Sequence, residues 1–241
     1  MKYLLFTILG ISALLFSQCR ENKENMHSND IPRDSIYKYI NEQFSKYIFE
    51  YRMGQIGEVD SVQEKRLKIV YDSAVYFANR GYDEFPNDIF FIYRKVSMLL
   101  DLKHFDEAIE LSQKHPIPIV ELPDYPYMKI IINRFNAMKC MSSNSMEERD
   151  KYLKNAIEEI EQYVLNHRET IEGSLINKDG SFNSNSPYYF PLEQYYVYSL
   201  VMYDKVQVLK KIQSLFQLSP TMSYHFADNY THEDFEVFNG I

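Results

Sequence analysis

The stretch that decides the fold is residues 89–111, IFFIYRKVSMLLDLKHFDEAIEL. Its apolar residues recur at steps of three and four, which is the spacing of an amphipathic helix with one buried face. Asp88 can cap the start of this helix, which we expect to run from Ile89 to about Lys103. Its buried face is expected to hold Ile92, Val96, Leu99 and Leu100. A tight turn over residues 103–105 then leads into a second helix, so the stretch predicts a helical hairpin.

Part of this stretch resembles a known repeat. The residues Leu99, Phe105, Asp106, Glu107, Ala108 and Ile109 resemble the second half of a tetratricopeptide repeat. In that family a small Ala lets two antiparallel helices approach, and the aromatic residue before it packs into the gap. Ala74 lies 34 residues before Ala108, which is the period of the family, and Pro86 stands where a proline often separates repeats. The resemblance covers residues 61–114 and implies stacked antiparallel helical hairpins.

Helical patterns continue on both sides of this region. Residues 34–53 carry one apolar stripe, and Ser61 to Glu64 form a predicted capping box at the start of a helix that ends before Pro86. Further helices are expected over 127–141, from Ser145 through Val164, over 192–203 and over 206–216. The proline-rich segment 115–127 is expected to be non-helical, and Asp179-Gly180 to make a turn, with a small β-hairpin as one alternative. We therefore predict an all-α fold of about four stacked hairpins in one domain over 34–241, with the tail from Gln217 covering the open end.

The N-terminus predicts export. A charged start precedes an apolar run over residues 3–16, which is the pattern of a signal peptide over residues 1–18. Phe16-Ser17-Gln18-Cys19 resembles the lipobox of bacterial lipoproteins, although Gln18 departs from the usual small residue. The resemblance implies lipidation of Cys19, with residues 19–33 as a polar tether. Ordinary secretion and an uncleaved anchor are the alternatives.

Cysteine and charge usage limit the partners. If Cys19 carries lipid, only Cys140 remains, so no internal disulfide can form and Cys140 is expected to be packed in a core. The net charge is −8, and the basic residues are scattered. Nucleic acid and anionic membrane surfaces are therefore poor candidate partners. We expect attachment to the bacterial cell envelope, with the outer membrane favoured, through the lipid alone.

We find no catalytic motif in the sequence. Zinc-protease, nucleophile-elbow and phosphate-loop patterns are missing, and seven glycines leave few tight loops. We therefore expect a non-enzymatic protein without a cofactor or a bound metal. The weak metal alternative is the tail set of His225, Asp228, His232, Glu233 and Asp234.

Two binding hypotheses follow. If the repeat starts at Ile89, the resemblance implies a concave groove that holds a protein or peptide partner. It is lined by Phe90, Tyr93, Ser97, Leu100 and Asp101. A groove filled by the proline-rich segment or the tail would leave Phe90 and Tyr93 as ordinary packing. The alternative function is glycan or ligand capture at the tyrosine-rich region, with Tyr188 and Tyr189 as the platform, although packing between helices is favoured for those rings.

Overall fold

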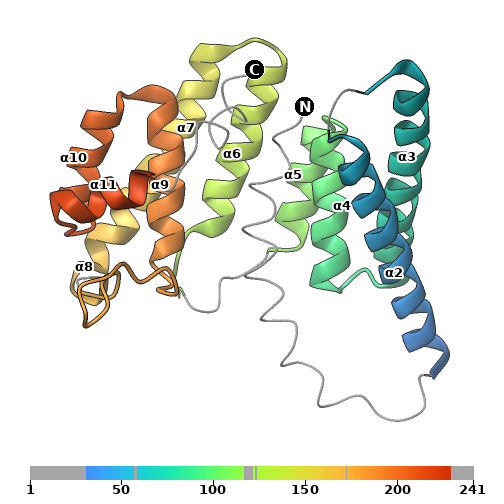
Figure 1. Ribbon diagram of the computed structural model, residues 1–241, viewed down its shortest axis with the longest axis horizontal. Coiled ribbons are helices and arrows are strands. Elements are labelled where there is room, and N and C mark those ends of the chain that lie inside the picture. Colours follow the sequence, from blue (N-terminus) through green and yellow to red (C-terminus); the bar gives the residue numbers. More distant parts are fainter. Residues whose placement is uncertain (1–30, 57–58, 117–121, 123, 172, 229–241) are drawn as a thin grey trace. The chain divides into compact units, whose positions relative to one another are not determined.

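The computed structural model describes residues 31–56, 59–116, 122, 124–171 and 173–228. Ten helices and no strand occur in these ranges, which confirms the all-α fold (Figure 1). The chain divides into two compact units, one ending at His115 and the other starting at Pro116. The single domain expected over 34–241 stays a prediction, and the signal peptide, Cys19 and most of the tether lie outside the described residues.

The first unit holds four helices, α2 (Ile31–Gly54), α3 (Ser61–Glu84), α4 (Ile89–Asp101) and α5 (Phe105–Lys114). Each helix packs on the next one along the chain, α2 on α3, α3 on α4 and α4 on α5. The core between them joins residues from three of the helices, namely Ile40, Phe44, Ile48, Ala74, Phe77, Ala78, Phe91 and Met98. The predicted stripes of α2 and α3 therefore meet in one core, to which α4 contributes Phe91 and Met98. The residues predicted for the buried face of α4, Ile92, Val96, Leu99 and Leu100, are buried as well but are not part of this cluster.

Helix starts follow from capping carboxylates. The Asp88 carboxylate accepts a hydrogen bond from the Phe90 amide at 2.9 Å, as expected for the start of α4. For α3 the predicted cap was wrong, because the capping residue is Asp60 and not Ser61. Asp60 accepts from the amides of Val62 and Gln63 at 2.9 and 2.8 Å. Asp and Ser are both common at this position. In this structure the carboxylate of Asp60 is the group that reaches the free amides.

Small residues allow α3, α4 and α5 to approach closely. Ala74 and Ala108 are both fully buried, where the repeat resemblance expects small residues. Gly81 belongs to the same set although the sequence pattern did not single it out. A Cβ added at Gly81 would overlap the ring of Phe91, which is itself fully buried.

The second unit holds α6 (Tyr127–Ser142), α7 (Met146–Asn166), α8 (Arg168–Ile171), α9 (Tyr189–Met202), α10 (Lys205–Leu215) and α11 (Pro220–Asp228). The main pairs are α6 with α7, α7 with α9, α9 with α10 and α10 with α11. α9 begins three residues earlier than expected and contains Pro191, which the first turn of a helix tolerates. α11 was not predicted as a helix. It places Phe226, 1% exposed, against the rings of Tyr189 and Tyr196.

The connection between α8 and α9 contains the expected turn. Gly180 has a φ of +82°, which favours glycine, and the carboxylate of Asp179 accepts from the amide of Ser181 at 2.9 Å. One antiparallel bridge joins Ile176 to Phe182, so the hairpin is a single bridge rather than two strands. Within the part of the chain that the structure describes, every helix is too short or too polar to cross a bilayer.

Candidate functional site

The face of α4 that the sequence assigned to a groove is only partly open. Phe90, Tyr93, Ser97 and Asp101 are all half-buried. Leu100, which the sequence analysis placed both on the buried face and in the groove, is 7% exposed and belongs to the core. The four half-buried residues follow one another at steps of three and four, so they form one stripe along α4. We call this stripe, together with the neighbouring side of α2, the α2–α4 face.

Arg94 lies on the core side of this face and contacts both of its helices. It is 7% exposed, and its guanidinium lies between two aromatic rings, with its central carbon 3.6 Å from the centre of Phe90 and 4.1 Å from that of Phe44. Its Nη2 donates to Asn41 Oδ1 at 2.8 Å and to Ser45 Oγ at 3.3 Å. Arg94 thus ties α4 to α2 through both stacking and hydrogen bonds.

Among the residues that the structure describes, no carboxylate forms a hydrogen bond with Arg94. Its Nη1 is buried and has no hydrogen-bond partner there. Burial lowers the pKa of Arg94 to about 9, while Tyr37 and Asp88 act in the opposite direction. The side chain therefore stays protonated near pH 7, and the two rings and two polar groups around it offset part of the cost of burial.

Asp101 forms a second polar cluster at the other end of the face. Burial raises the pKa of Asp101 to about 6, although the Tyr71 hydroxyl and the charge of Arg52 act in the opposite direction. Burial also lowers the pKa of Arg52, which Asp101 and Tyr93 oppose. The rings of Tyr51 and Tyr71 lie 4.7 Å apart beside this cluster. Asp101 and Tyr93, predicted as neighbours in a groove, therefore share one charged neighbour on α2.

These contacts define how α2 and α4 run. Arg94 meets Asn41 and Ser45 early in α2, whereas Asp101 lies near Arg52 at its end. The two helices therefore lie side by side in the same direction. An aromatic ring, hydroxyls and charged groups alternate along their shared face. This arrangement could contact a polypeptide segment that carries both apolar and polar side chains. No group of three or more His, Cys, Asp or Glu side chains in the described ranges could hold a metal ion.

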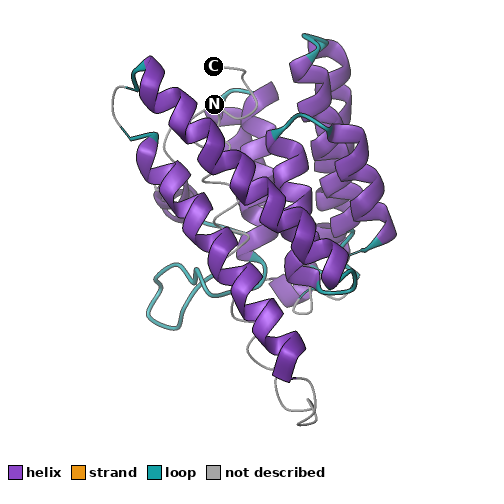
Figure 2. Ribbon diagram, turned by 90° about the vertical axis from the view of Figure 1, so that its right-hand side faces the viewer, coloured by secondary structure: helices purple, strands orange, loops and turns teal. Residues whose placement is uncertain are grey.

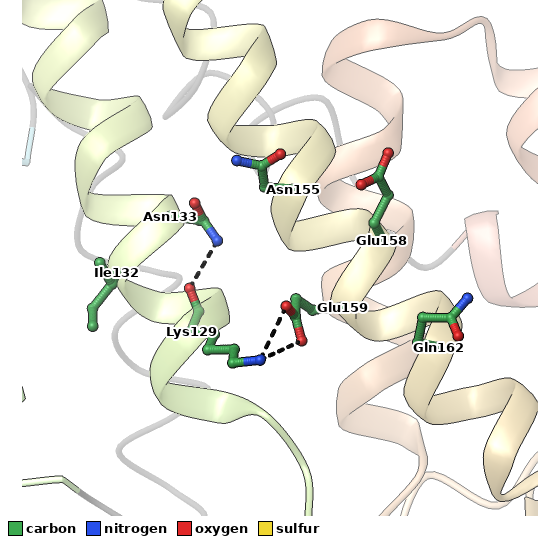
Figure 3. A pocket seen from close by; sticks show the side chains of 7 residues that line it. All are labelled: Lys129, Ile132, Asn133, Asn155, Glu158, Glu159 and Gln162. Atoms are coloured by element: carbon green, nitrogen blue, oxygen red, sulfur yellow. Dashed lines mark hydrogen bonds and ion pairs between the residues drawn. The ribbon is translucent and has the colours of Figure 1, made fainter.

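A second depression lies in the second unit, between α6 and α7. It has a volume of about 500 Å³, and its walls are polar on both helices (Figure 3). Lys129 Nζ pairs with Glu159 Oε1 at 3.3 Å across it, and Asn133 Nδ2 donates to the Lys129 carbonyl at 3.0 Å. Lys129 and Asn133 thus have their main polar partners within the helix pair, and the depression resembles an ordinary solvated groove between two helices.

The tyrosine-rich region is mainly packed. Tyr188 is buried, with 9% exposed, and Tyr189 is half-buried against the rings of Phe182 and Phe226 at 5.5 and 5.6 Å. A buried ring cannot lie flat against a sugar, so Tyr188 is not available as a platform in this structure. Cys140 is also buried, and burial raises the pKa of its thiol. Of the tail metal candidates, His232, Glu233 and Asp234 lie outside the described residues.

Four residues of the α2–α4 face escaped the sequence analysis, namely Asn41, Ser45, Arg52 and Arg94. Polar side chains on an amphipathic helix are normally solvated, so Arg94, between buried Ile92 and Val96, gave no sign that it would be buried. The aromatic pair Phe90-Phe91 was the only local signal that a cation could stack there.

No family model matches the chain, and no curated protein and no solved structure matches it. The resemblance to tetratricopeptide repeats therefore rests on the residues quoted above, and function has to be argued from the geometry of the site.

Proposed function

We propose that this protein is a non-enzymatic helical-repeat scaffold of the cell envelope, anchored through lipid on Cys19, which binds a protein or peptide partner along the α2–α4 face. The observation that carries the proposal is the half-buried stripe of Phe90, Tyr93, Ser97 and Asp101, supported from below by Arg94. The stacked, consecutive packing of α2 to α5 supports a repeat architecture.

The physical properties of the face favour a peptide over a small molecule. The stripe extends over three turns of α4, which is about 17 Å, and it alternates an apolar ring with hydroxyl and charged groups. A peptide presents apolar side chains and backbone amides at comparable spacings, and a preorganised face limits the entropy lost on binding. The alternative, glycan capture by Tyr188 and Tyr189, has less support because both rings pack inside the second unit.

The test places a bulky cation in the middle of the face. Ser97→Arg is expected to abolish capture of the partner, because Ser97 lies between Tyr93 and Asp101 on the stripe. Asn79→Arg is the matched control, since Asn79 is exposed on α3 and lies outside the face. The measurement is crosslinking in intact cells followed by quantitative mass spectrometry of the captured proteins.

A genuine partner is one whose yield falls at least tenfold with Ser97→Arg and stays unchanged with Asn79→Arg. Tyr93→Ala, which removes a half-buried ring without adding bulk, should lower the same yield while the melting temperature stays close to that of the wild type. Equal capture by all four proteins would refute the proposal.

A further inference from the structure

The side of the α2–α3 hairpin that faces away from α4 is unusually apolar. Six large apolar side chains on it are more than half exposed, namely Phe49, Met53, Ile56, Val62, Ile69 and Tyr76. Val62 is 75% and Ile69 68% exposed. We call this set the outer face. Soluble proteins expose single apolar residues routinely, but a contiguous apolar face has a use.

Helix geometry shows that these residues are contiguous. Val62, Ile69 and Tyr76 follow at steps of seven residues, so they form one stripe along α3. Phe49 and Met53, one turn apart on α2, line a cleft of about 600 Å³ together with Val62 and Arg66. Figure 2 shows α2 and α3 side by side at the front. Phe49, Met53 and Val62 therefore share one surface, and Ile69 and Tyr76 continue the stripe of Val62 along α3.

The opposite side of α3 carries the contacts to α4. Gly81 lies against Phe91, and Tyr82 lies under Lys95, whose Nζ is 4.3 Å from the centre of the ring. α3 thus buries one side within the unit and leaves the outer face at the end of the stack formed by the described helices α2 to α5. Terminal hairpins of such stacks need a polar outer side to stay soluble. This hairpin has an apolar one, which indicates that another surface covers it.

The area is sufficient for a stable contact. At roughly 150–250 Å² for a large apolar side chain, the six residues expose on the order of 600 Å². A standard interface buries about 800 Å² per partner, so the outer face with its charged rim reaches that size. A patch of this size is at the upper end of what a typical monomer exposes, and such patches often mark an interaction site.

The charges of the rim favour a second copy of this chain. Glu50 and Arg66 pair at 2.9 Å across the cleft, and both signs occur around it, with Glu42, Lys46 and Arg80 on the same helices. The chain as a whole has a net charge of −8, so two copies repel each other except where a surface has balanced charges. A surface that carries both signs of charge around an apolar centre can be self-complementary about a two-fold axis, because groups of opposite sign on the two copies can face each other.

We propose that the outer face is a homodimer interface, in which two copies stack their α2–α3 hairpins face to face about a two-fold axis. The interface lies on a different side of the unit from the α2–α4 face, so the dimer leaves that face open. The inference does not depend on the proposed peptide binding and can fail separately from it.

The experiment is cysteine crosslinking of the full chain in intact cells. Ile69 lies in the middle of the stripe, so Ile69→Cys is expected to give a covalent dimer on mild oxidation. Cys140 is buried and does not compete, and Cys19 is replaced by serine in both proteins of the comparison if it proves not to carry lipid. The matched control Asn79→Cys, exposed on the same helix but off the stripe, should stay monomeric on a denaturing gel.

The second measurement is the mass of the purified full chain by sedimentation. The wild type is expected to sediment as a dimer, and Ile69→Glu with Val62→Glu is expected to halve its mass. The helical circular dichroism of this variant should match that of the wild type, because both positions are exposed. A monomeric wild type without an Ile69→Cys crosslink would overturn the proposal. So would an Ile69→Cys adduct with a different protein, which would assign the face to another partner.

Discussion

Replacing Gly81 with alanine tests the packing of α3 on α4. Gly81 lies in the last turn of α3 and is buried. Its missing side chain leaves the space that the Phe91 ring occupies, and a Cβ at this position would overlap the ring. We therefore expect the Gly81→Ala variant to be less stable than the wild type, although alanine is the better helix former.

Two opposing terms set the magnitude. Gly to Ala within a helix gains about 1 kcal/mol in helix propensity. Overpacking a tight core costs about 1–3 kcal/mol, and the upper part of that range applies because Phe91 has no room to move. Its ring is fully buried and lies 5.0, 5.5 and 5.6 Å from those of Tyr37, Phe85 and Phe90. The net loss is therefore about 1–2 kcal/mol in the free energy of unfolding.

The assay is urea unfolding followed by far-ultraviolet circular dichroism, because the chain has no tryptophan. Asn79→Ala is the control for helix propensity, since Asn79 is exposed on the same helix, and it should raise stability by a few tenths of a kcal/mol. Phe91→Leu removes part of the ring. In the double variant the total loss in unfolding free energy should be about 1 kcal/mol smaller than the sum of the two single-variant losses. The reason is that the smaller side chain leaves space for the new methyl group.

The result that would refute this reasoning is a Gly81→Ala variant that gains about 1 kcal/mol, as propensity alone requires. A strictly additive double variant would equally show that residues 81 and 91 do not touch. Either outcome would mean that α3 and α4 cross at a different place from the one described above.

Three further predictions rest on single residues. Ala108→Leu should lower the free energy of unfolding by about 1–3 kcal/mol, because Ala108 is fully buried where α5 packs on α4. A variant that melts at the same temperature as the wild type would contradict the repeat alignment. The pKa of Asp101 is raised to about 6 from an ordinary value of 3.8, so the folded state binds this proton more tightly than the unfolded state. The stability that this protonation contributes is present below about pH 4 and is lost as the pH rises to 6. The difference in unfolding free energy between the wild type and Asp101→Asn should therefore change by about 1–3 kcal/mol across that window, and a constant difference would exclude the buried carboxyl. Metabolic labelling with a fatty-acid analogue should mark the wild type and not Cys19→Ala, and a label that persists in the variant would disprove lipidation at that residue.

Local patterns predicted most of the helices because each depends on residues close in sequence. The stripes Leu67, Val70, Ala74 in α3 and Leu153, Ala156, Ile160 in α7 are buried as periodicity required. The errors occurred where two local solutions have similar energy. Asp60 and Ser61 are both good caps, and Pro191 can either precede a helix or lie in its first turn, so residue type alone did not decide between the two.

The candidate site was predicted only in outline. Phe90, Tyr93, Ser97 and Asp101 lie on one stripe because the helical repeat places them there, and that much follows from spacing alone. Whether such a stripe is open depends on the neighbouring helix. α2 lies alongside it and is bonded to Arg94, whose guanidinium stacks on the Phe90 ring, while Leu100 is buried in the core.

The sequence by itself determined an all-α chain, the position of its main helices and the small residues at Ala74 and Ala108, since these depend on the 3.6-residue period and on local capping. The tertiary structure alone decided the burial of Arg94 between Phe44 and Phe90, the environment that shifts the pKa of Asp101, and the exposure of Val62 and Ile69. Periodicity states which residues share a face of one helix. Contacts between residues about 50 positions apart in the chain, such as Asn41 and Arg94, decide which second helix covers that face. They therefore also decide which charged side chains lose their contact with water.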